Sequence, residues 1–141
     1  MARFRLALIK VFLGDRVDMV RAGARAKTYL DASEALLAEA EELLASGDLR
    51  EASEKFWGAV VQAVKAVAEA RGWEHYRHHH ISRAISRLVA ETGDVELSRL
   101  FSSAERLNAN FYEGLMSELE LRAHAEDARK LVGKLGALLA S

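Results

Sequence analysis

The sequence of 141 residues contains no cysteine and no proline, and its only side-chain amides are those of Gln62, Asn108 and Asn110. Without cysteine, the chain forms no disulfide and no thiolate metal site, and it has no cysteine nucleophile. This absence suits a reducing compartment, so we predict a cytoplasmic protein. Without proline, no helix is interrupted by a missing backbone donor. Few amides and no cysteine are also typical of thermophile proteins.

The sequence also lacks a long hydrophobic run and an excess of one charge. Its net charge is −1, so no overall field directs it to nucleic acid. The apolar stretch at residues 4–13 is interrupted by Lys10, is too short to cross a bilayer and is followed by a basic stretch instead of a cleavage site. We therefore predict neither a membrane span nor a signal peptide.

Positive charge is nevertheless concentrated locally. Residues 71–87 contain four arginines and four histidines against the single acid Glu74. The histidines at 75–80 do not have the spacing of a structural zinc site, and no cysteine completes one, so we predict no metal and no cofactor. Two interpretations remain: a polar connection between helices, or a pH-sensitive or phosphate-facing patch. The arginines of such a patch would be Arg71, Arg77, Arg83 and Arg87.

Half of the residues are hydrophobic, with abundant alanine and leucine, which favours an all-α fold. Apolar periodicity, terminating glycines and acidic or serine caps predict helices at 15–46, 48–71, 81–92, 95–116 and 117–139. The short connections favour antiparallel neighbours. We therefore predict an antiparallel four- to five-helix up-and-down bundle. It would be one domain, 1–141, in which an apolar and basic extension (1–14) precedes the bundle (15–141).

The helix at 48–71 is apolar around most of its circumference, which is typical of the central helix of a bundle. Gly58 lies within it and costs about 1 kcal/mol relative to alanine in a helix interior. We therefore predict that another backbone approaches the helix closely at Gly58.

The fourth predicted helix carries the most informative polar residues. Asn108 falls on its apolar stripe, so we predict that Asn108 is buried and hydrogen-bonded inside the bundle. Arg106 and Asn110 share one helix face, and Asn108 and Tyr112 lie one turn apart. These four residues form either a structural hydrogen-bond network or a polar cleft that recognises nucleotide or RNA. No glycine-rich phosphate loop or paired-carboxylate motif is present, and Ser, His and Asp are scattered, which argues against a nucleophilic hydrolase.

Two segments, ASEKFWGAVVQAVKAVA (52–68) and AERLNANFYEG (104–114), resemble the signature helices of the archaeal PaREP family. This family belongs to the HEPN (higher eukaryotes and prokaryotes nucleotide-binding) superfamily, and the resemblance covers about residues 24–138. It implies an antiparallel helical bundle that is often a homodimer. Many HEPN proteins are RNA-cleaving toxins or partners of minimal nucleotidyltransferases.

The resemblance also indicates where the sequence departs from active relatives. RNA-cleaving HEPN proteins carry an arginine, four to six residues, and then a histidine. Arg71 and His78 have that spacing, but they fall at a helix end and in a loop. In PaREP-like sequences the fourth helix typically reads Leu-His-x-Asn-Phe-Tyr, and here Asn108 occupies the histidine position. An amide cannot shuttle a proton, which makes cleavage doubtful.

Our leading hypothesis is a non-catalytic HEPN-like protein that binds nucleotide, RNA or a partner protein within a toxin–antitoxin type pair. The expected partners are a second copy of the chain and a minimal nucleotidyltransferase. The first alternative is a metal-independent endoribonuclease, in which Arg106 stabilises the developing charge and a loop histidine such as His78 supplies the proton. The second is a TPR-like interaction adaptor, based on the helix–Gly-Asp–helix rhythm of residues 38–60.

Overall fold

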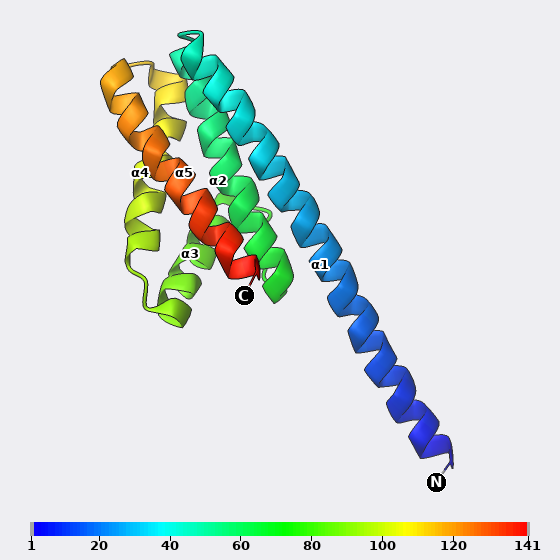
Figure 1. The fold of residues 1–141 in the computed structure, drawn as a ribbon. Coiled ribbons are helices and arrows are strands. Elements are labelled where there is room, and N and C mark those ends of the chain that lie inside the picture. The colour runs from blue at the N-terminus through cyan, green and yellow to red at the C-terminus, as the bar shows by residue number, and fades with distance from the viewer. Residues whose placement is uncertain (1, 141) are drawn as a thin grey trace.

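The computed structural model describes residues 2–140, with side chains from Leu13 onward, and this part of the chain is five α-helices without a strand. Helices α1 and α2 form an antiparallel hairpin, and α4 and α5 form a second one beside α2 (Figure 1). The short α3 lies toward the end of the bundle where α2 finishes. The predicted all-α up-and-down bundle is confirmed. The helices are α1 (Ala2–Ala45), α2 (Leu49–Arg71), α3 (His78–Thr92), α4 (Glu96–Glu113) and α5 (Glu118–Ala140).

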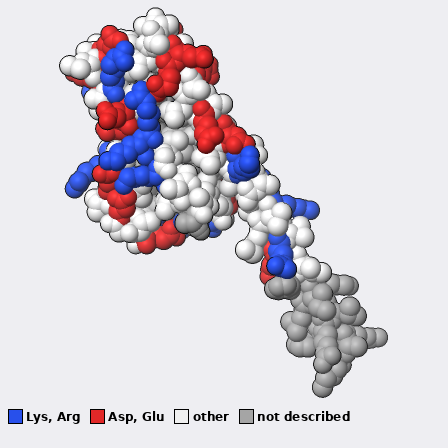
Figure 2. Space-filling view, viewed as in Figure 1, with Lys and Arg blue, Asp and Glu red and all other residues white. Residues whose placement is uncertain are grey.

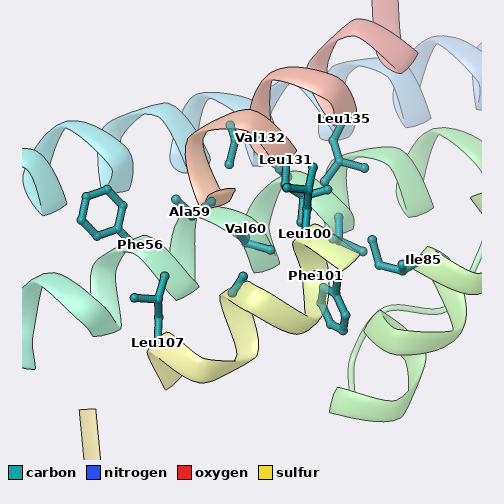
Figure 3. Packing of buried hydrophobic residues seen from close by; sticks show 14 of the residues in the cluster. Phe56, Ala59, Val60, Ile85, Leu100, Phe101, Leu107, Leu131, Val132 and Leu135 are labelled. Atoms are coloured by element: carbon teal, nitrogen blue, oxygen red, sulfur yellow. The ribbon is translucent and has the colours of Figure 1, made fainter. Parts of the chain in front are cut away.

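Helix α2 is the centre of the bundle, as its apolar circumference predicts, because it packs against each of the other four helices. Phe56 and Val60 of α2 are fully buried. They share one hydrophobic cluster with Phe101 and Leu107 of α4 and Leu131 of α5 (Figure 3). Removing these apolar side chains from water supplies the main driving force for the fold.

Helix α1 is much longer than predicted, because it begins at Ala2 and not near residue 15. Nothing in the sequence stops it: Gly14 costs a helix only about 1 kcal/mol, and no proline is present. Its N-terminal half projects beyond the bundle (Figure 1). The predicted apolar stretch at residues 4–13 falls, except for Leu13, outside the part of the chain whose side chains the structure describes. Leu13, Val17 and Val20 are exposed on the projecting part.

Several predicted helix ends are confirmed by their caps. Gly72 and Gly93 end α2 and α3 in the left-handed conformation, with φ of 73° and 74°. Asp48 caps α2 by accepting from the backbone N–H of Glu51 at 3.4 Å. The capping box before α5 is complete, because Ser117 Oγ accepts from the Glu120 N–H at 3.2 Å and Glu120 Oε2 accepts from the Ser117 N–H at 3.1 Å.

Two further helix ends differ from the prediction, each for a local reason. Helix α3 begins at His78, not Ile81, and the His80 Nδ1 accepts from the N–H of Tyr76 and Arg77. Helix α4 ends at Glu113, not Met116, because Gly114 takes a left-handed φ of 65°. A side-chain acceptor at a helix start replaces an intrahelical partner, and a left-handed residue ends a helix.

The prediction of a close backbone approach at Gly58 is wrong. The atom that a Cβ at Gly58 would meet is the side-chain Cδ1 of Leu36, at 3.4 Å. Gly58 therefore makes room for a leucine of α1.

Within residues 2–140, none of the helices combines the length and the apolar content that crossing a bilayer requires.

Candidate functional site

A groove of about 390 Å³ lies between α2 and α4, with α1 at its edge. We call it the aromatic groove, because three of its residues are aromatic. Its size is within the range of small-ligand sites. The groove is lined by Leu36, Glu54, Lys55, Trp57, Gly58, Val61, Gln62, Asn108, Phe111 and Tyr112.

The aromatic rings of the groove differ in how tightly they are held. The half-buried Trp57 ring packs against Phe101 and His78, with centroid separations of 5.7 Å and 5.8 Å. Phe111 meets Tyr112 edge to face at 5.0 Å. Tyr112 is 72% exposed, so its ring is accessible to a ligand. The groove thus presents one fixed and one accessible aromatic ring.

The polar groups of the groove are mainly uncharged. Asn108 from α4 and Gln62 from α2 each bring an amide, which both donates and accepts hydrogen bonds. The two charged lining residues are Glu54 and Lys55, whose charges offset each other. Lys55 Nζ also lies 3.8 Å from a carboxylate oxygen of Glu39. The groove therefore suits a planar, polar and uncharged group better than an anion.

Buried and charge-assisted hydrogen bonds fix the end of α4 that carries Phe111 and Tyr112. The Asn110 Nδ2 donates to Ser53 Oγ of α2 at 2.8 Å, and the Asn110 Oδ1 accepts from the Met116 N–H at 2.9 Å. Arg50 donates from Nε and Nη2 to the Phe111 carbonyl at 3.0 Å and 2.8 Å. These contacts satisfy groups that the helix end leaves without intrahelical partners.

The prediction that Asn108 is the buried amide is therefore wrong. Asn108 is half-buried in the groove wall, whereas Asn110 is 4% exposed and hydrogen-bonded through both its Nδ2 and its Oδ1. The buried face of α4 continues from Ala104 through Leu107 to Asn110 at helical spacing. Asn108 lies about 100° round the helix from Leu107, which turns it into the groove.

Of the two alternatives for Arg106, Asn108, Asn110 and Tyr112, the single cleft is not formed, although the expected pairs are present. Asn108 and Tyr112 both line the aromatic groove. Arg106 and Asn110 line a separate depression of about 260 Å³ together with Glu113, Met116 and Glu120. Two faces of one helix cannot turn toward the same cleft, so the four residues divide between two surfaces.

Of the catalytic candidates, Arg71 and His78 are each paired with a different glutamate, and Arg106 lines a depression that contains neither of them. Arg71 makes a bidentate pair with Glu91, with Nη2 to Oε2 at 2.8 Å, and this pair holds the pKa of Glu91 below its usual range. His78 Nε2 lies 3.4 Å from Glu105, and the exposed Arg106 lines the depression described above. The Arg71–His78 spacing therefore does not produce a joint site.

One histidine of the segment at 75–80, His75, is buried and does not belong to a polar surface. His75 is 1% exposed, its ring meets Tyr29 edge to face, and its Nε2 lies 2.6 Å from Glu69 Oε2. Glu69 also accepts from Arg25 of α1, and the hydrogen bonds from His75 and Arg25 lower the pKa of Glu69. Within the described side chains, no three His, Asp or Glu converge in the manner of a metal site.

Ser, His and Asp do meet at one point, which sequence spacing does not reveal. The Ser103 Oγ of α4 donates to Asp127 Oδ2 at 2.6 Å and lies 2.7 Å from His124 Nδ1 of α5. The serine here bridges the other two residues, whereas in a catalytic triad the histidine does so. Because the hydroxyl proton is directed to Asp127, His124 is not placed to remove it. The cluster joins α4 to α5.

Sequence reasoning missed Trp57, Gln62 and Phe111 as groove residues. Trp57 and Phe111 lie on apolar stripes of their helices, and Gln62 lies on a narrow polar seam of α2. An apolar stripe next to a polar seam lines a groove only where the neighbouring helix does not cover both of them. That neighbour comes from residues about 50 positions away in the chain, so local periodicity does not show it.

The fold and the groove define the class: an all-helical bundle with an aromatic and amide-lined groove beside its central helix. Residues 28–132 match the archaeal PaREP1/PaREP8 family, and the chain belongs to that family. Its structure is similar to the crystal structure of a protein from Sulfolobus solfataricus. The TM-score is 0.69 and the identity 27%, with 75% of this chain and 94% of the other covered. No curated protein matches the sequence.

Proposed function

We propose that the aromatic groove binds the base of a nucleotide or of single-stranded RNA, and that the protein binds without cleaving. The observation that carries the proposal is one groove containing the accessible ring of Tyr112, the fixed ring of Trp57 and the amide of Asn108. Unpaired bases stack on aromatic side chains and form hydrogen bonds through their edges. The offsetting charges of the groove favour a base over a phosphate.

The identity of residue 108 supports binding without catalysis. Where the family resemblance places a histidine, this chain carries Asn108, which hydrogen-bonds but does not transfer a proton. The remaining candidates Arg71 and His78 are each engaged by a glutamate at separate places. The ribonuclease alternative thus has less support than recognition of a base.

The binding test is fluorescence anisotropy with a labelled single-stranded oligoribonucleotide. Tyr112→Ala should weaken binding about tenfold, because stacking one base on an aromatic ring contributes about 1–3 kcal/mol. Tyr76→Ala is the matched control, since Tyr76 is 78% exposed and does not line the groove. Equal dissociation constants for Tyr112→Ala and Tyr76→Ala would contradict the proposal.

The catalytic test uses the same oligoribonucleotide on a denaturing gel at neutral pH, with and without divalent metal. We expect the RNA to stay intact. Specific cleavage that disappears in Arg106→Ala or His78→Ala would instead establish the endoribonuclease alternative. Such cleavage could still coexist with base binding, so the two tests are separate.

The proposed partners follow from the family resemblance and from one feature of α1. Membership of a toxin–antitoxin type pair predicts a gene for a minimal nucleotidyltransferase beside this one, and copurification of the two products tests it. A homodimer is supported by Leu13, Val17 and Val20, which lie exposed at helical spacing on the projecting part of α1. A cytoplasmic location is supported by the absence of cysteine.

A further inference from the structure

A second concave site lies at the junction of α2 and α3 and is separate from the aromatic groove. It has a volume of about 240 Å³ and contains two arginines of α3, a tryptophan and a histidine. We call it the Trp73 pocket. Its lining residues are Gly72, Trp73, Glu74, His80, Arg83, Ala84 and Arg87.

The helix end fixes Trp73 in this pocket. Gly72 is left-handed with a φ of 73°, its N–H bonds to the Glu69 carbonyl, and the Trp73 N–H bonds to the Ala68 carbonyl at 2.8 Å. This pair of bonds is the Schellman arrangement, which determines the direction of the chain after a helix. The Trp73 indole therefore has a defined position against α3.

Two guanidinium groups flank the indole, and they differ in what they bind. The Arg71 guanidinium lies 5.8 Å from the Trp73 ring centre and is paired with Glu91. The Arg87 guanidinium lies 5.1 Å from the same ring centre. Among residues 13–140, no carboxylate pairs with Arg87 or with Arg83, which lies one helical turn before it. The pocket thus holds two guanidinium groups that no described carboxylate pairs with.

The one carboxylate of the pocket is already engaged. His80 Nδ1 accepts from two backbone N–H groups, so its Nε2 carries the ring proton, and this Nε2 lies 3.1 Å from Glu74 Oε2. The Glu74 carboxylate therefore lies beside His80, the third residue of α3, and pairs with neither Arg83 nor Arg87. Ala84, 2% exposed, contributes a small side chain to the wall of the pocket. The site keeps a net positive charge, since Arg83 and Arg87 outnumber Glu74.

We propose that the Trp73 pocket is a phosphate-binding site, in which the guanidinium groups of Arg83 and Arg87 bind the oxygens of one phosphate group. Planar guanidinium forks match phosphate geometry and form charge-assisted hydrogen bonds. Stacking against Trp73 orders the Arg87 side chain before the ligand arrives, which lowers the entropy lost on binding. The site does not depend on the proposed base recognition in the aromatic groove.

The test is a titration of the full chain with sodium tripolyphosphate, an anion without a base. In Trp57→Phe, Trp73 is the only tryptophan, so its emission reports the pocket, and calorimetry detects binding that leaves the emission unchanged. We expect saturable binding that Arg83→Gln and Arg87→Gln each weaken about tenfold, as loss of a charged hydrogen bond does. Glu74→Gln should tighten binding, because it removes the only negative charge in the pocket.

Arg99→Gln is the matched control, because Arg99 is an exposed arginine of α4 that does not line the pocket. Absence of saturable binding by both methods, or equal weakening in Arg99→Gln, Arg83→Gln and Arg87→Gln, would overturn the proposal. Competition by a single-stranded oligoribonucleotide would identify the source of the phosphate as an RNA backbone. Tripolyphosphate binding without such competition would identify it as a free phosphate compound.

Discussion

At the scale of single residues, the buried amide of Asn110 holds the end of α4 against α2. It bonds to Ser53 Oγ and receives the Met116 N–H, while Ser53 itself also donates to the Leu49 carbonyl. Asn108, two positions earlier, is half-buried in the aromatic groove. The two asparagines therefore have separable roles, one in stability and one in binding.

The first prediction compares these two asparagines. Asn110→Ala should lower the free energy of unfolding by about 1–3 kcal/mol, because it leaves the Met116 N–H without its acceptor in a partly buried position. Asn108→Ala should change the stability by less than about 0.5 kcal/mol, as is usual for substitutions away from the core. Urea unfolding followed by circular dichroism measures both. An equal loss in the two variants would contradict the assignment of Asn110 as the structural amide.

The second prediction concerns Glu69, whose pKa is lowered by hydrogen bonds from His75 and Arg25. A carboxyl group whose pKa is lower in the folded than in the unfolded state stabilises the protein at pH values above its unfolded-state pKa, which is about 4.3. That stabilisation is lost as the pH falls through the folded-state pKa. Glu69→Gln should therefore be clearly less stable than the natural chain at pH 7. The difference should shrink as the pH falls below about 4.

Urea unfolding at a series of pH values from 7 downward measures this effect. Glu42→Gln, a substitution at an exposed position of α1, is the control and should show a small difference at every pH. A difference for Glu69→Gln that stays constant across the series would contradict the role of the Glu69 charge.

At the scale of the elements, two of the left-handed glycines that end helices differ in their surroundings. Gly72 has a φ of 73°, and the Cβ of a residue placed there would meet no atom within 4 Å. Gly114 has a φ of 65°, and a Cβ there would lie 3.2 Å from Arg50 Cδ. Arg50 also donates to the carbonyls of Phe111 and Tyr112. A side chain at Gly114 would therefore disturb the cap of α4 as well as strain the backbone.

The third prediction follows from that difference. Gly72→Ala should cost about 1–2 kcal/mol, the penalty of a left-handed alanine. Gly114→Ala should cost more, because Arg50 must move from carbonyls that it binds. In Arg50→Ala the two glycine substitutions should become similar in cost. Thermal unfolding of the three single variants and the two double variants measures this, and equal costs in the presence of Arg50 would contradict it.

At the scale of the whole molecule, the projecting half of α1 is the feature that the bundle does not explain. Figure 2 shows acidic and basic side chains interleaved over the bundle in this view, so charge alone does not mark a docking face there. The projecting helix instead exposes Leu13 by 54%, Val17 by 47% and Val20 by 72%. Apolar side chains at this spacing form a stripe that a second helix can cover.

The fourth prediction is that this stripe joins two copies of the chain. Val17→Glu combined with Val20→Glu should convert the dimer to a monomer, because each buried carboxylate would lack a partner. Size-exclusion chromatography with light scattering measures the mass. Replacing Val95, an exposed valine before α4, with glutamate is the control. A natural chain that is monomeric, or a double variant that remains dimeric, would contradict the prediction.

The class of fold, the central position of α2 and most helix ends could be predicted from local sequence patterns. These features are local: periodicity identifies the buried face, Gly72 and Gly93 adopt conformations that few other residues tolerate, and Ser117 and Glu120 satisfy each other across three positions. The pairs of polar residues on α4 were also predictable, because helical geometry relates positions a few residues apart.

The packing of the helices sets which asparagine is buried, how the four polar residues of α4 divide between two surfaces, and where the aromatic groove lies. Asn108 and Asn110 are about 200° apart on the helix, so the rotation of α4 about its own axis decides which of them faces the core. The bonds of Ser103 to His124 and Asp127, and of Arg71 to Glu91, join residues on different helices. Such contacts depend on the angles and rotations at which helices pack, which are set by the whole core and not by local sequence.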